Sequence, residues 1–412
     1  MNSLIKLSNP LPIAILSLGL VSHLGSVANA ATFTRVLQTG QAVPGNAQPV
    51  TNIRSIAIDN QQNIVAIVST PTIILNPTRG PQTFQGLYVF NSALVPTLAD
   101  TAESFPFASD GQSAQFLTAS INAGTVITLR NSRLESRPQR DFGQSEVKVG
   151  KPGALRTFLT VNRFNLLPRV SISTLALSNG AAFLLGESSP QPPASSQKGL
   201  LKSVAPNNLT EVIATTDPVF GTEPFTLTSR GEFVRASGKN ILLVIEDNNR
   251  YRVFKKSGTA APQQIDSVTG SFSCGAAISS NNIVVCARDF RTQTGTNLYS
   301  LRVKFGNTAP FQSIAFPNTT AIEQPSIAGR TVIFKTATPT QDKLYVSTNA
   351  KAPIQILGTG DTLDGKTVSK LSLSEQGQSI ARTTDQAQNS SLTIVFIATF
   401  TDGTTGLYRG TL

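Results

Sequence analysis

The stretch GLYRG, residues 406–410 of TDGTTGLYRG (401–410), has a counterpart near the other end of the chain, GLYVF (86–90) within FQGLYVFN (84–91). Both copies place Leu and Tyr after a glycine and read as short strands. A strand pattern that returns at both ends of a sequence indicates repeated units, with the last unit built like the first.

Seven apolar runs mark these units along the chain. Each run is rich in β-branched residues and bounded by polar turn residues, which predicts strands rather than helices. The lack of alternation indicates strands that are covered on both faces. They recur at intervals of roughly 40–60 residues, a spacing typical of repeat folds. The runs are IVAIV (64–68), TVITL (125–129), AAFLLG (181–186), ILLVI (241–245), IVVCA (283–287), TVIF (331–334) and TIVFIATF (393–400).

Three further strand patterns accompany most of these runs. An alternating strand such as RSIAIDN (54–60) precedes the run, and two more strands follow it, such as KLYVS (343–347) and PIQIL (353–357). Four antiparallel strands per unit predict an all-β fold, a β-propeller of about seven four-stranded blades, with six or eight as the alternatives. A radial array also explains a single domain over 31–412, because one compact core stops growing near roughly 250–300 residues.

The last unit lacks a fourth strand, because the sequence stops after GLYRGTL (406–412). RVLQTG (35–40) resembles QILGTG (355–360), the fourth strand of the preceding unit. We therefore expect the N-terminal strand to join the last blade and close the ring. Closure would hide the sheet edges that an open array leaves unpaired.

A longer motif surrounds the last apolar run, with the form GD-x-L-x-G before it and DG-x-x-GLY after it. This pattern resembles the repeat of exported bacterial tandem-repeat β-propellers, many of which carry a C-terminal sorting anchor. The resemblance implies the fold and export but no activity, and the lack of an anchor helix here favours release or periplasmic residence. The first unit holds a partial copy, and the middle units match only in strand pattern. The matching residues are Gly360, Asp361, Leu363, Gly365, Val368, Asp402, Gly403, Gly406, Leu407 and Tyr408, and in the first unit Gly40, Gln41, Val43, Gly45, Gly86, Leu87 and Tyr88.

Residues 1–30 have the pattern of a secretory signal peptide. Lys6 precedes an apolar stretch from Ile13 to Leu24, and Ala28-Asn29-Ala30 forms a small-x-small cleavage site. The alternative, an uncleaved membrane anchor, needs an apolar run of roughly 20 residues. We therefore expect an exported protein, periplasmic or extracellular, with no transmembrane segment after cleavage.

The part of the chain after residue 30 contains no histidine, because the only one is His23. This excludes Ser-His-Asp and Cys-His catalytic arrangements and removes the commonest metal-binding nitrogen. We predict neither a cofactor nor a metal site. The net charge of +11 falls to +10 without Lys6, which suits an anionic polysaccharide or another envelope component. Export disfavours nucleic acid as a partner.

Basic residues gather in one segment, which we interpret as a basic insertion around 130–153. Its loop-like part, RNSRLESRPQRDFGQ (130–144), would extend a blade. Arginine can hold carboxylate, sulfate or phosphate in a bidentate manner, so the segment is a candidate anion-binding surface. A solvated insertion without a ligand is the alternative. The candidate residues are Arg130, Arg133, Arg137, Arg140, Lys148 and Lys151.

Two hypotheses of function follow. The first is a non-catalytic binding protein for an anionic glycan or other envelope component, acting through one end of the propeller or the basic insertion. The second is a carboxylate-dependent glycan-cleaving enzyme with its site at the central channel, since two carboxylates suffice for that chemistry. Acids converging at the channel beside an Arg or Tyr would favour the enzyme, and Ser, Thr and Asn would favour binding. The acids of the fourth unit, which also suit an ordinary surface, are Glu223, Glu232, Glu246 and Asp247.

Cys274 and Cys286 are the only cysteines, and they flank GAAISSNNIVV (275–285). This segment reads as two strands around a turn at Ser280–Asn282, which would place the two cysteines opposite each other within reach of a disulfide. Outside the cytoplasm such a pair forms a bridge. Two small buried residues that never pair are the alternative.

We predict that the exported protein carries a Cys274–Cys286 bridge. Iodoacetamide should label neither cysteine under denaturing conditions unless a reductant is added first, and mass spectrometry of the intact chain reads this out. Replacing both cysteines with serine should lower the free energy of unfolding by about 2–4 kcal/mol. Labelling of both thiols without a reductant would contradict the bridge.

Overall fold

The computed structural model describes residues 31–71, 83–104, 112–134, 142–162, 169–178, 181–189, 197–205, 208–214, 217–220, 233–247, 250–269, 272–289, 298–316, 321–374, 378–382 and 391–412. In these ranges every element is a β-strand except the short 3-10 helix η1 (Pro218–Phe220). None of the helical structure seen there is long and apolar enough to cross a membrane. The expected signal peptide lies outside the described residues and stays a prediction.

The strands follow the four-strand order that the sequence predicts, and each apolar run lies in a second strand. The first strands are β2 (Asn52–Ile58), β6 (Gln112–Asn122), β10 (Arg169–Ser178), β14 (Phe233–Ser237), β18 (Phe272–Ser279) and β22 (Ala321–Ala328). The second strands are β3 (Ile64–Ser69), β7 (Thr125–Leu134), β11 (Ala181–Ser189), β15 (Asn240–Asp247), β19 (Asn282–Asp289), β23 (Thr331–Ala337) and β29 (Leu392–Phe400).

The third and fourth strands complete the pattern. The third strands are β4 (Thr83–Phe90), β8 (Phe142–Gly150), β12 (Gln197–Ala205), β16 (Arg250–Ser257), β20 (Leu298–Lys304), β24 (Asp342–Thr348) and β30 (Thr405–Thr411). The fourth strands are β5 (Pro96–Ser104), β9 (Arg156–Asn162), β13 (Asn208–Ala214), β17 (Gln263–Thr269), β21 (Gln312–Ile314) and β25 (Ile354–Gly358). The last sheet also contains β1 (Thr32–Gln38), β26 (Thr362–Leu363), β27 (Lys366–Ser372) and β28 (Ile380–Arg382).

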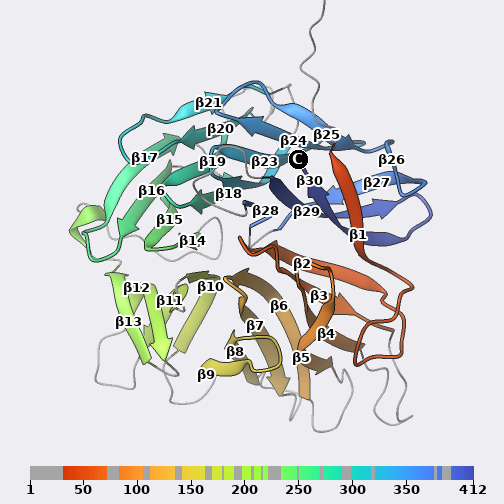
Figure 1. Cartoon of the computed structure of the whole chain (residues 1–412). Coiled ribbons are helices and arrows are strands. Elements are labelled where there is room, and N and C mark those ends of the chain that lie inside the picture. Colours follow the sequence, from red (N-terminus) through yellow and green to blue (C-terminus); the bar gives the residue numbers. More distant parts are fainter. Residues whose placement is uncertain are drawn as a thin grey trace, which may run out of the picture.

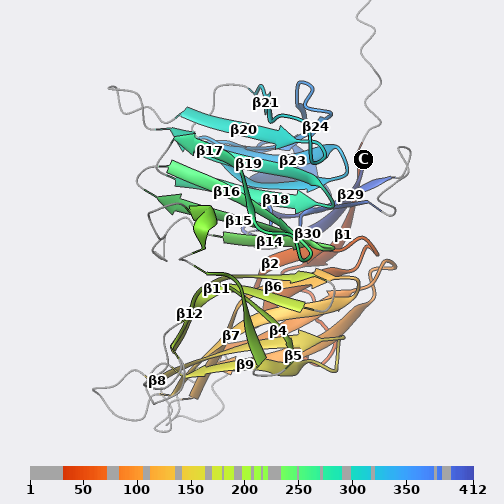
Figure 2. The ribbon, with the colours of Figure 1, turned by 90° about the vertical axis from the view of Figure 1, so that its left-hand side faces the viewer.

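Hydrogen bonds join these strands into six sheets arranged around a centre as an all-β propeller (Figures 1 and 2). Four sheets have four strands each, in sequence order, and the last has six. The structure shows six blades, one of the expected alternatives to seven, because β2 to β9 of the first sheet form one eight-stranded unit. The physical reason is one residue pair, Ser104 with Ser113, which connects β5 to β6.

The hydrophobic core lies between neighbouring sheets, as the second strand β15 illustrates. Leu242 belongs to a buried cluster with Ile278 of the following sheet. The adjacent residue Leu243 belongs to another cluster, with Phe183 of the preceding sheet. Successive side chains of a strand point to opposite faces, so each apolar run serves two cores. This confirms why the runs show no alternation.

The N-terminal strand closes the ring as predicted. β1 pairs antiparallel with β30, with Phe33 opposite Gly410 and Arg35 opposite Tyr408. Beyond the strand, the Thr39 amide donates to the Thr405 carbonyl oxygen (2.8 Å). The last sheet therefore takes one strand from the start of the chain and the others from its end (Figure 1).

The turn after β1 is built like the turn after β25, which bears out the partial copy in the first unit. In the later turn Asp361 Oδ2 accepts a hydrogen bond from the Gly358 amide (2.6 Å). In the earlier turn Gln41 Oε1 accepts the equivalent bond from the Gln38 amide (2.7 Å). The glycine before each acceptor has a positive φ, 94° and 89° respectively, a conformation that glycine adopts without strain.

The Gly-Leu-Tyr sequence has a packing cause. A Cβ atom at Gly406 would lie 2.6 Å from the ring of Tyr408, and at Gly86 the equivalent distance to Tyr88 is 2.3 Å. Each tyrosine ring therefore lies over the glycine two residues before it. The Tyr408 ring is also stacked on Phe396, with ring centroids 5.7 Å apart, so it has no room to move aside. Both tyrosines are fully buried, and burial raises the pKa of Tyr88 to about 12.

We predict that Gly406→Ala lowers the free energy of unfolding by about 1–3 kcal/mol, because the added methyl group collides with a ring that cannot shift. Urea titration followed by circular dichroism measures this. Thr411→Ala, on the exposed end of the same strand, is the matched control and should change stability by less than about 0.5 kcal/mol. In the double variant Gly406→Ala/Tyr408→Ala the glycine substitution should lose its effect. Equal stability of the Gly406→Ala and Thr411→Ala variants would contradict this packing argument.

Candidate functional site

The candidate site is a cavity of about 230 Å³ where first strands end and second strands begin, which we call the mouth end of the propeller. Because β2, β6, β14, β18, β22 and β28 all contribute, the cavity lies on the central axis. Its floor is apolar and built from one isoleucine of each of five strands. These are Ile58, Ile121, Ile278, Ile327 and Ile380, all buried.

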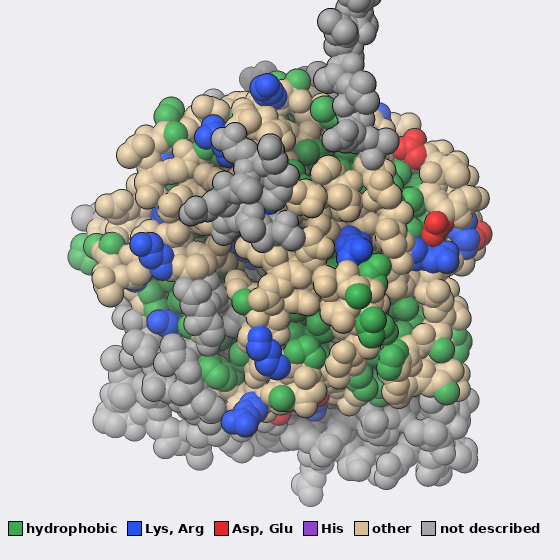
Figure 3. All heavy atoms as spheres, in the orientation of Figure 1, with side chains coloured by type: hydrophobic (Ala, Val, Ile, Leu, Met, Phe, Trp, Pro, Cys, Tyr) green, Lys and Arg blue, Asp and Glu red, His purple; other side chains and the backbone are tan. Residues whose placement is uncertain are grey.

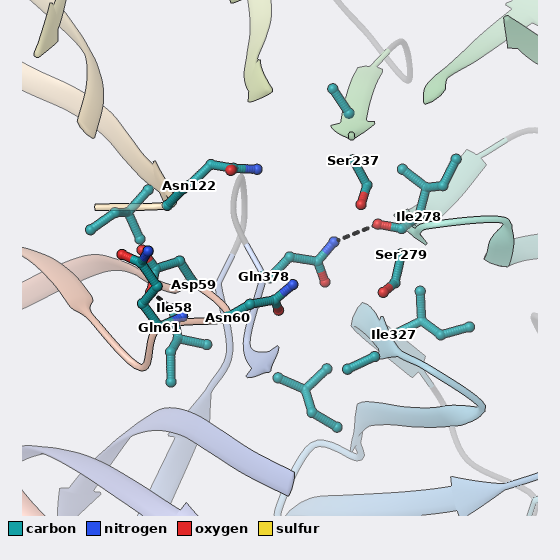
Figure 4. A pocket seen from close by; sticks show the side chains of 15 residues that line it. Ile58, Asp59, Asn60, Gln61, Asn122, Ser237, Ile278, Ser279, Ile327 and Gln378 are labelled. Carbon is teal, nitrogen blue, oxygen red and sulfur yellow. Dashed lines mark hydrogen bonds between the residues drawn. The ribbon is translucent and has the colours of Figure 1, made fainter. Parts of the chain in front are cut away.

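Amide and hydroxyl side chains surround the opening above this floor (Figure 4). An apolar floor with a few convergent polar groups is typical of a ligand-binding cavity. Among the described residues that line it there is no Arg, Lys or Tyr, and Asp59 is the only acid. The polar lining residues are Asn60, Gln61, Asn122, Ser237, Ser279 and Gln378.

Asp59 is buried and both of its carboxylate oxygens accept hydrogen bonds. Oδ1 accepts from the backbone amides of Gln61 (3.0 Å) and Asn63 (2.9 Å). Oδ2 accepts from the Gly124 amide (2.6 Å) and from Asn63 Nδ2 (3.1 Å). The carboxylate therefore joins the turn after β2 to the turn after β6. This is a structural role, and it leaves no lone pair well placed for acid–base catalysis.

Gln378 crosses the opening between the last sheet and β18. Its Nε2 donates to the Ile278 carbonyl oxygen (3.0 Å), and its backbone oxygen accepts from the Ile58 amide (2.9 Å). Its Oε1 is buried and accepts no hydrogen bond from the part of the chain that the structure describes. A buried acceptor without a donor is costly, so a ligand hydroxyl or a water is its expected partner.

Two asparagines at equivalent positions tie neighbouring sheets together beside the cavity. Asn240 Nδ2 donates to the Ser280 carbonyl oxygen (2.6 Å), and Asn282 Nδ2 donates to the Gly329 carbonyl oxygen (2.6 Å). Each asparagine is the first residue of a second strand and reaches the turn of the next sheet. The polar groups at the mouth are therefore held on a rigid frame.

The predicted anion-binding residues Arg130 and Lys148 are already paired with carboxylates. Arg130 Nε lies 3.8 Å from Glu146 Oε2, and Lys148 Nζ lies 2.7 Å from Asp100 Oδ2. Arg130 also donates to a carbonyl oxygen of β5, that of Thr101 (3.2 Å). Each of these two cations therefore has a carboxylate beside it, and the anion-binding surface as a whole stays a prediction.

The remaining predicted basic residues do not gather into one site. Lys151 Nζ donates to the Ala123 carbonyl oxygen at the mouth end (2.8 Å). Arg133 lies in β7, and its side chain is outside the described part of the structure. Arg137 and Arg140 lie outside the described residues. Residues 130–134 belong to β7 and residues 142–144 to β8, which corrects the loop-like interpretation of these two parts of the segment 130–144.

Cys274 and Cys286 lie on the adjacent strands β18 and β19. Cys286 is buried and lies opposite Gly275, and a register shift between Ser273 and Gly275 puts the backbone of Cys274 beside it. The Cys274 side chain is outside the described part, so the bridge stays a prediction. The expected hairpin is confirmed, with Ser279 opposite Asn282.

The two acids of the fourth unit that the structure describes, Glu246 and Asp247, lie at the end of their strand that is away from the cavity. Glu246 and Asp247 end β15, whereas the first residue of that strand, Asn240, lies at the mouth end. Glu223 and Glu232 lie outside the described residues. No cluster of three or more His, Cys, Asp or Glu that could hold a metal ion occurs in the described ranges.

Sequence reasoning did not single out the lining residues. A signal was present, because a polar turn follows each first strand, as in DNQQN (59–63) and SSNN (279–282). These residues look like ordinary turn formers until the ring brings them together.

No protein-family model matches the chain, and no curated protein matches it. In structure it is similar to the β-propeller domain of the Trilobed protease from Pyrococcus furiosus, at 9% identity and a TM-score of 0.50, over 89% of this chain and 94% of that domain. It is also similar to a prolyl endopeptidase (11% identity, TM-score 0.49), over 92% of this chain and 50% of that one. The WD40 domain of Toxoplasma gondii coronin gives 10% identity and a TM-score of 0.38, over 93% of this chain and 86% of that domain.

The chain spans half of that peptidase and 61% of TolB from Acinetobacter baumannii, which it also resembles. At 9% identity, the likeness to the Pyrococcus furiosus domain supports the β-propeller fold and nothing about activity.

We predict that Asp59→Asn lowers the free energy of unfolding by about 1–3 kcal/mol, because an amide NH2 would face backbone donors in place of an oxygen. Thermal and urea unfolding measure the change. Asp402→Asn, at an exposed turn, removes the same charge, keeps an acceptor for the Thr404 amide and loses only a solvent-exposed ion pair with Lys366, so it should cost less than about 1 kcal/mol. If the Asp59→Asn variant is as stable as the Asp402→Asn control, the Asp59 carboxylate does not hold the turns after β2 and β6 together.

Proposed function

We propose that this protein is a non-catalytic binding protein that takes a hydroxyl-rich ligand, an anionic glycan of the cell envelope or its surroundings, at the mouth end of its central channel. The observation that supports this is the composition of the cavity. Amides and hydroxyls surround an apolar floor, and both oxygens of Asp59, the one acid among the described lining residues, already accept hydrogen bonds. Sugars present the hydroxyls and apolar ring faces that such a lining can accommodate.

The glycan-cleaving alternative has less support. Hydrolysis of a glycosidic bond by this route needs two carboxyl groups that flank the bond. Among the described residues lining the cavity only Asp59 carries a carboxyl group, and it serves as an acceptor for backbone amides. Neither an Arg nor a Tyr stands beside it in that lining.

The anionic character of the ligand is supported by the charge of the protein. The net charge is +10 without the leader, and a cationic surface attracts anions through long-range electrostatics. In Figure 3, Lys and Arg side chains are scattered over the visible face, while most of the visible Asp and Glu side chains lie toward its right-hand margin. We place the protein in the periplasm or outside the cell, on the pattern of its first thirty residues.

We further propose that the eight-stranded sheet acts as two blades, which would give seven blades and match the exported tandem-repeat propellers that the GD-x-L-x-G … DG-x-x-GLY pattern resembles. In support, Val65 and Leu87 of its first half share a buried cluster with Phe116 and Ile121 of its second half. Two halves of one flat sheet could not pack face to face in this way. The single pair between β5 and β6 is a weak connection by comparison.

The proposal is tested with residues 31–412 on a glycan array, followed by titration of the best oligosaccharide. We expect Gln378→Leu to weaken binding at least tenfold, because it removes the acceptor and the donor that cross the opening. Gln312→Leu, on the exposed part of β21, is the matched control and should bind as the unaltered protein does.

Two results would contradict the proposal. One is equal affinity of the Gln378→Leu and Gln312→Leu variants for the glycan. The other is shortening of the glycan during incubation with the protein, measured as new reducing ends, since that would show catalysis.

A further inference from the structure

The mouth end of the propeller is depleted of acidic residues. The connections at this end follow the first and the third strands. Among those that the structure describes, Asp59 is the only Asp or Glu, and its carboxylate already accepts hydrogen bonds from the protein, such as that of the Gly124 amide. Cations occur both in these connections and at the strand ends beside them. They include Lys151, Lys239, Lys255, Lys256, Lys304, Arg330 and Lys351.

Lys255 is the buried member of this group. It is 8% exposed, and its Nζ donates to Asn281 Oδ1 (3.1 Å) and Asn307 Oδ1 (2.5 Å). No described carboxylate pairs with it, so two neutral amides are what stabilise this ammonium group. A buried ammonium group without a counter-ion is unfavourable, which makes this position unusual.

The lysine fixes the orientation of both amides. Because each Oδ1 points inward to Lys255, each Nδ2 of Asn281 and Asn307 points away from it, and both asparagines are exposed. Asn240 Nδ2 adds a further bond to Asn281 Oδ1 (3.2 Å), which holds that amide in the same orientation. Two NH2 groups are thus presented toward solvent as hydrogen-bond donors.

Two further ammonium groups lie near this pair of amides. Lys304 is the last residue of β20 and donates to the Ala309 carbonyl oxygen in the connection that follows. Lys239 lies in the turn after β14. Burial lowers the pKa of Lys255, and the charges of Lys304 and Lys239 lower it further, which indicates that both of these ammonium groups act on Lys255 by charge repulsion. An anion bound between them would relieve this repulsion.

We propose that Lys239, Lys304 and the outward amides of Asn281 and Asn307, positioned by Lys255, form an anion subsite that binds a carboxylate or sulfate group of an acidic glycan. The inference rests on the proposed function, which it makes specific. The subsite adjoins the cavity, because Ser237 and Ser279 line the opening and directly precede the turns that carry Lys239 and Asn281. One glycan chain could therefore place its hydroxyls in the cavity and its charged group at the subsite.

The test measures the affinity of residues 31–412 for three probes: a sulfated heparin hexasaccharide, a hexamer of galacturonate and neutral maltohexaose. The variant Asn281→Asp/Asn307→Asp gives Lys255 the carboxylates it lacks, so we expect it to fold. It should bind the sulfated or the carboxylated probe at least tenfold more weakly and lose most of the salt dependence of binding. Lys239→Gln/Lys304→Gln should do the same. Lys343→Gln/Lys370→Gln removes two charges elsewhere and serves as the control.

The positioning role of Lys255 has its own readout. Lys255→Met keeps the length of the side chain and removes the buried charge, so the protein should be no less stable. Anion affinity should nevertheless fall about tenfold, because the two amides lose their fixed orientation. Unchanged anion affinity in this variant would overturn the positioning role.

The failure of the subsite can be told apart from the failure of the proposed function. If the subsite variants bind the acidic probes as the control does, while Gln378→Leu loses them, the subsite is wrong and binding in the cavity stands. If no oligosaccharide binds the unaltered protein, both fall. The last measurement uses sodium sulfate alone. If sulfate protects the protein against thermal unfolding at the same concentration as the sulfated hexasaccharide does, the assignment of the subsite to a glycan is overturned.

Discussion

The pairing of β1 with β30 is the interaction on which the rest of this structure depends. Sheets arranged about an axis have a core only between neighbours, so an open ring would leave two apolar faces without cover. Backbone hydrogen bonds from Phe33 and Arg35 to the last strand remove that gap. The cavity at the axis exists only because the ring is closed, since six strands from different parts of the chain must meet there.

The division of labour within each sheet explains why the ligand-binding groups lie where they do. Second strands such as β15 are apolar on both sides and serve only the cores. First strands end near the axis, and their last residues and turns are free to carry polar groups. Because the turns are tied to one another, through Asp59 and Gly124 or through Asn282 and Gly329, the polar rim is as rigid as the sheets below it. Such preorganisation lowers the entropy that a ligand must lose on binding.

Much of this architecture could be predicted from the sequence, for a physical reason. Burial on both faces forces a run such as ILLVI (241–245) to be continuously apolar, and closure forces the segment around Val36 to resemble a fourth strand, so both features are written locally. The connection of β5 to β6 could not be predicted in this way, because a single backbone pair does not require any particular residue type. The neutralisation of Arg130 and Lys148 was equally hidden, since Asp100 meets Lys148 only once β5 and β8 are side by side. The lining residues are turn formers by composition, and their convergence is a property of the ring alone.

The shared last sheet also sets the order in which the molecule can be completed. The ribosome synthesises β1 before any other strand of this fold, and its partner β30 is synthesised last. β1 therefore lacks its hydrogen-bonding partner until the whole of this fold has been synthesised. Contacts between segments so far apart in the sequence form slowly, so we expect closure of the ring to be a late step of folding.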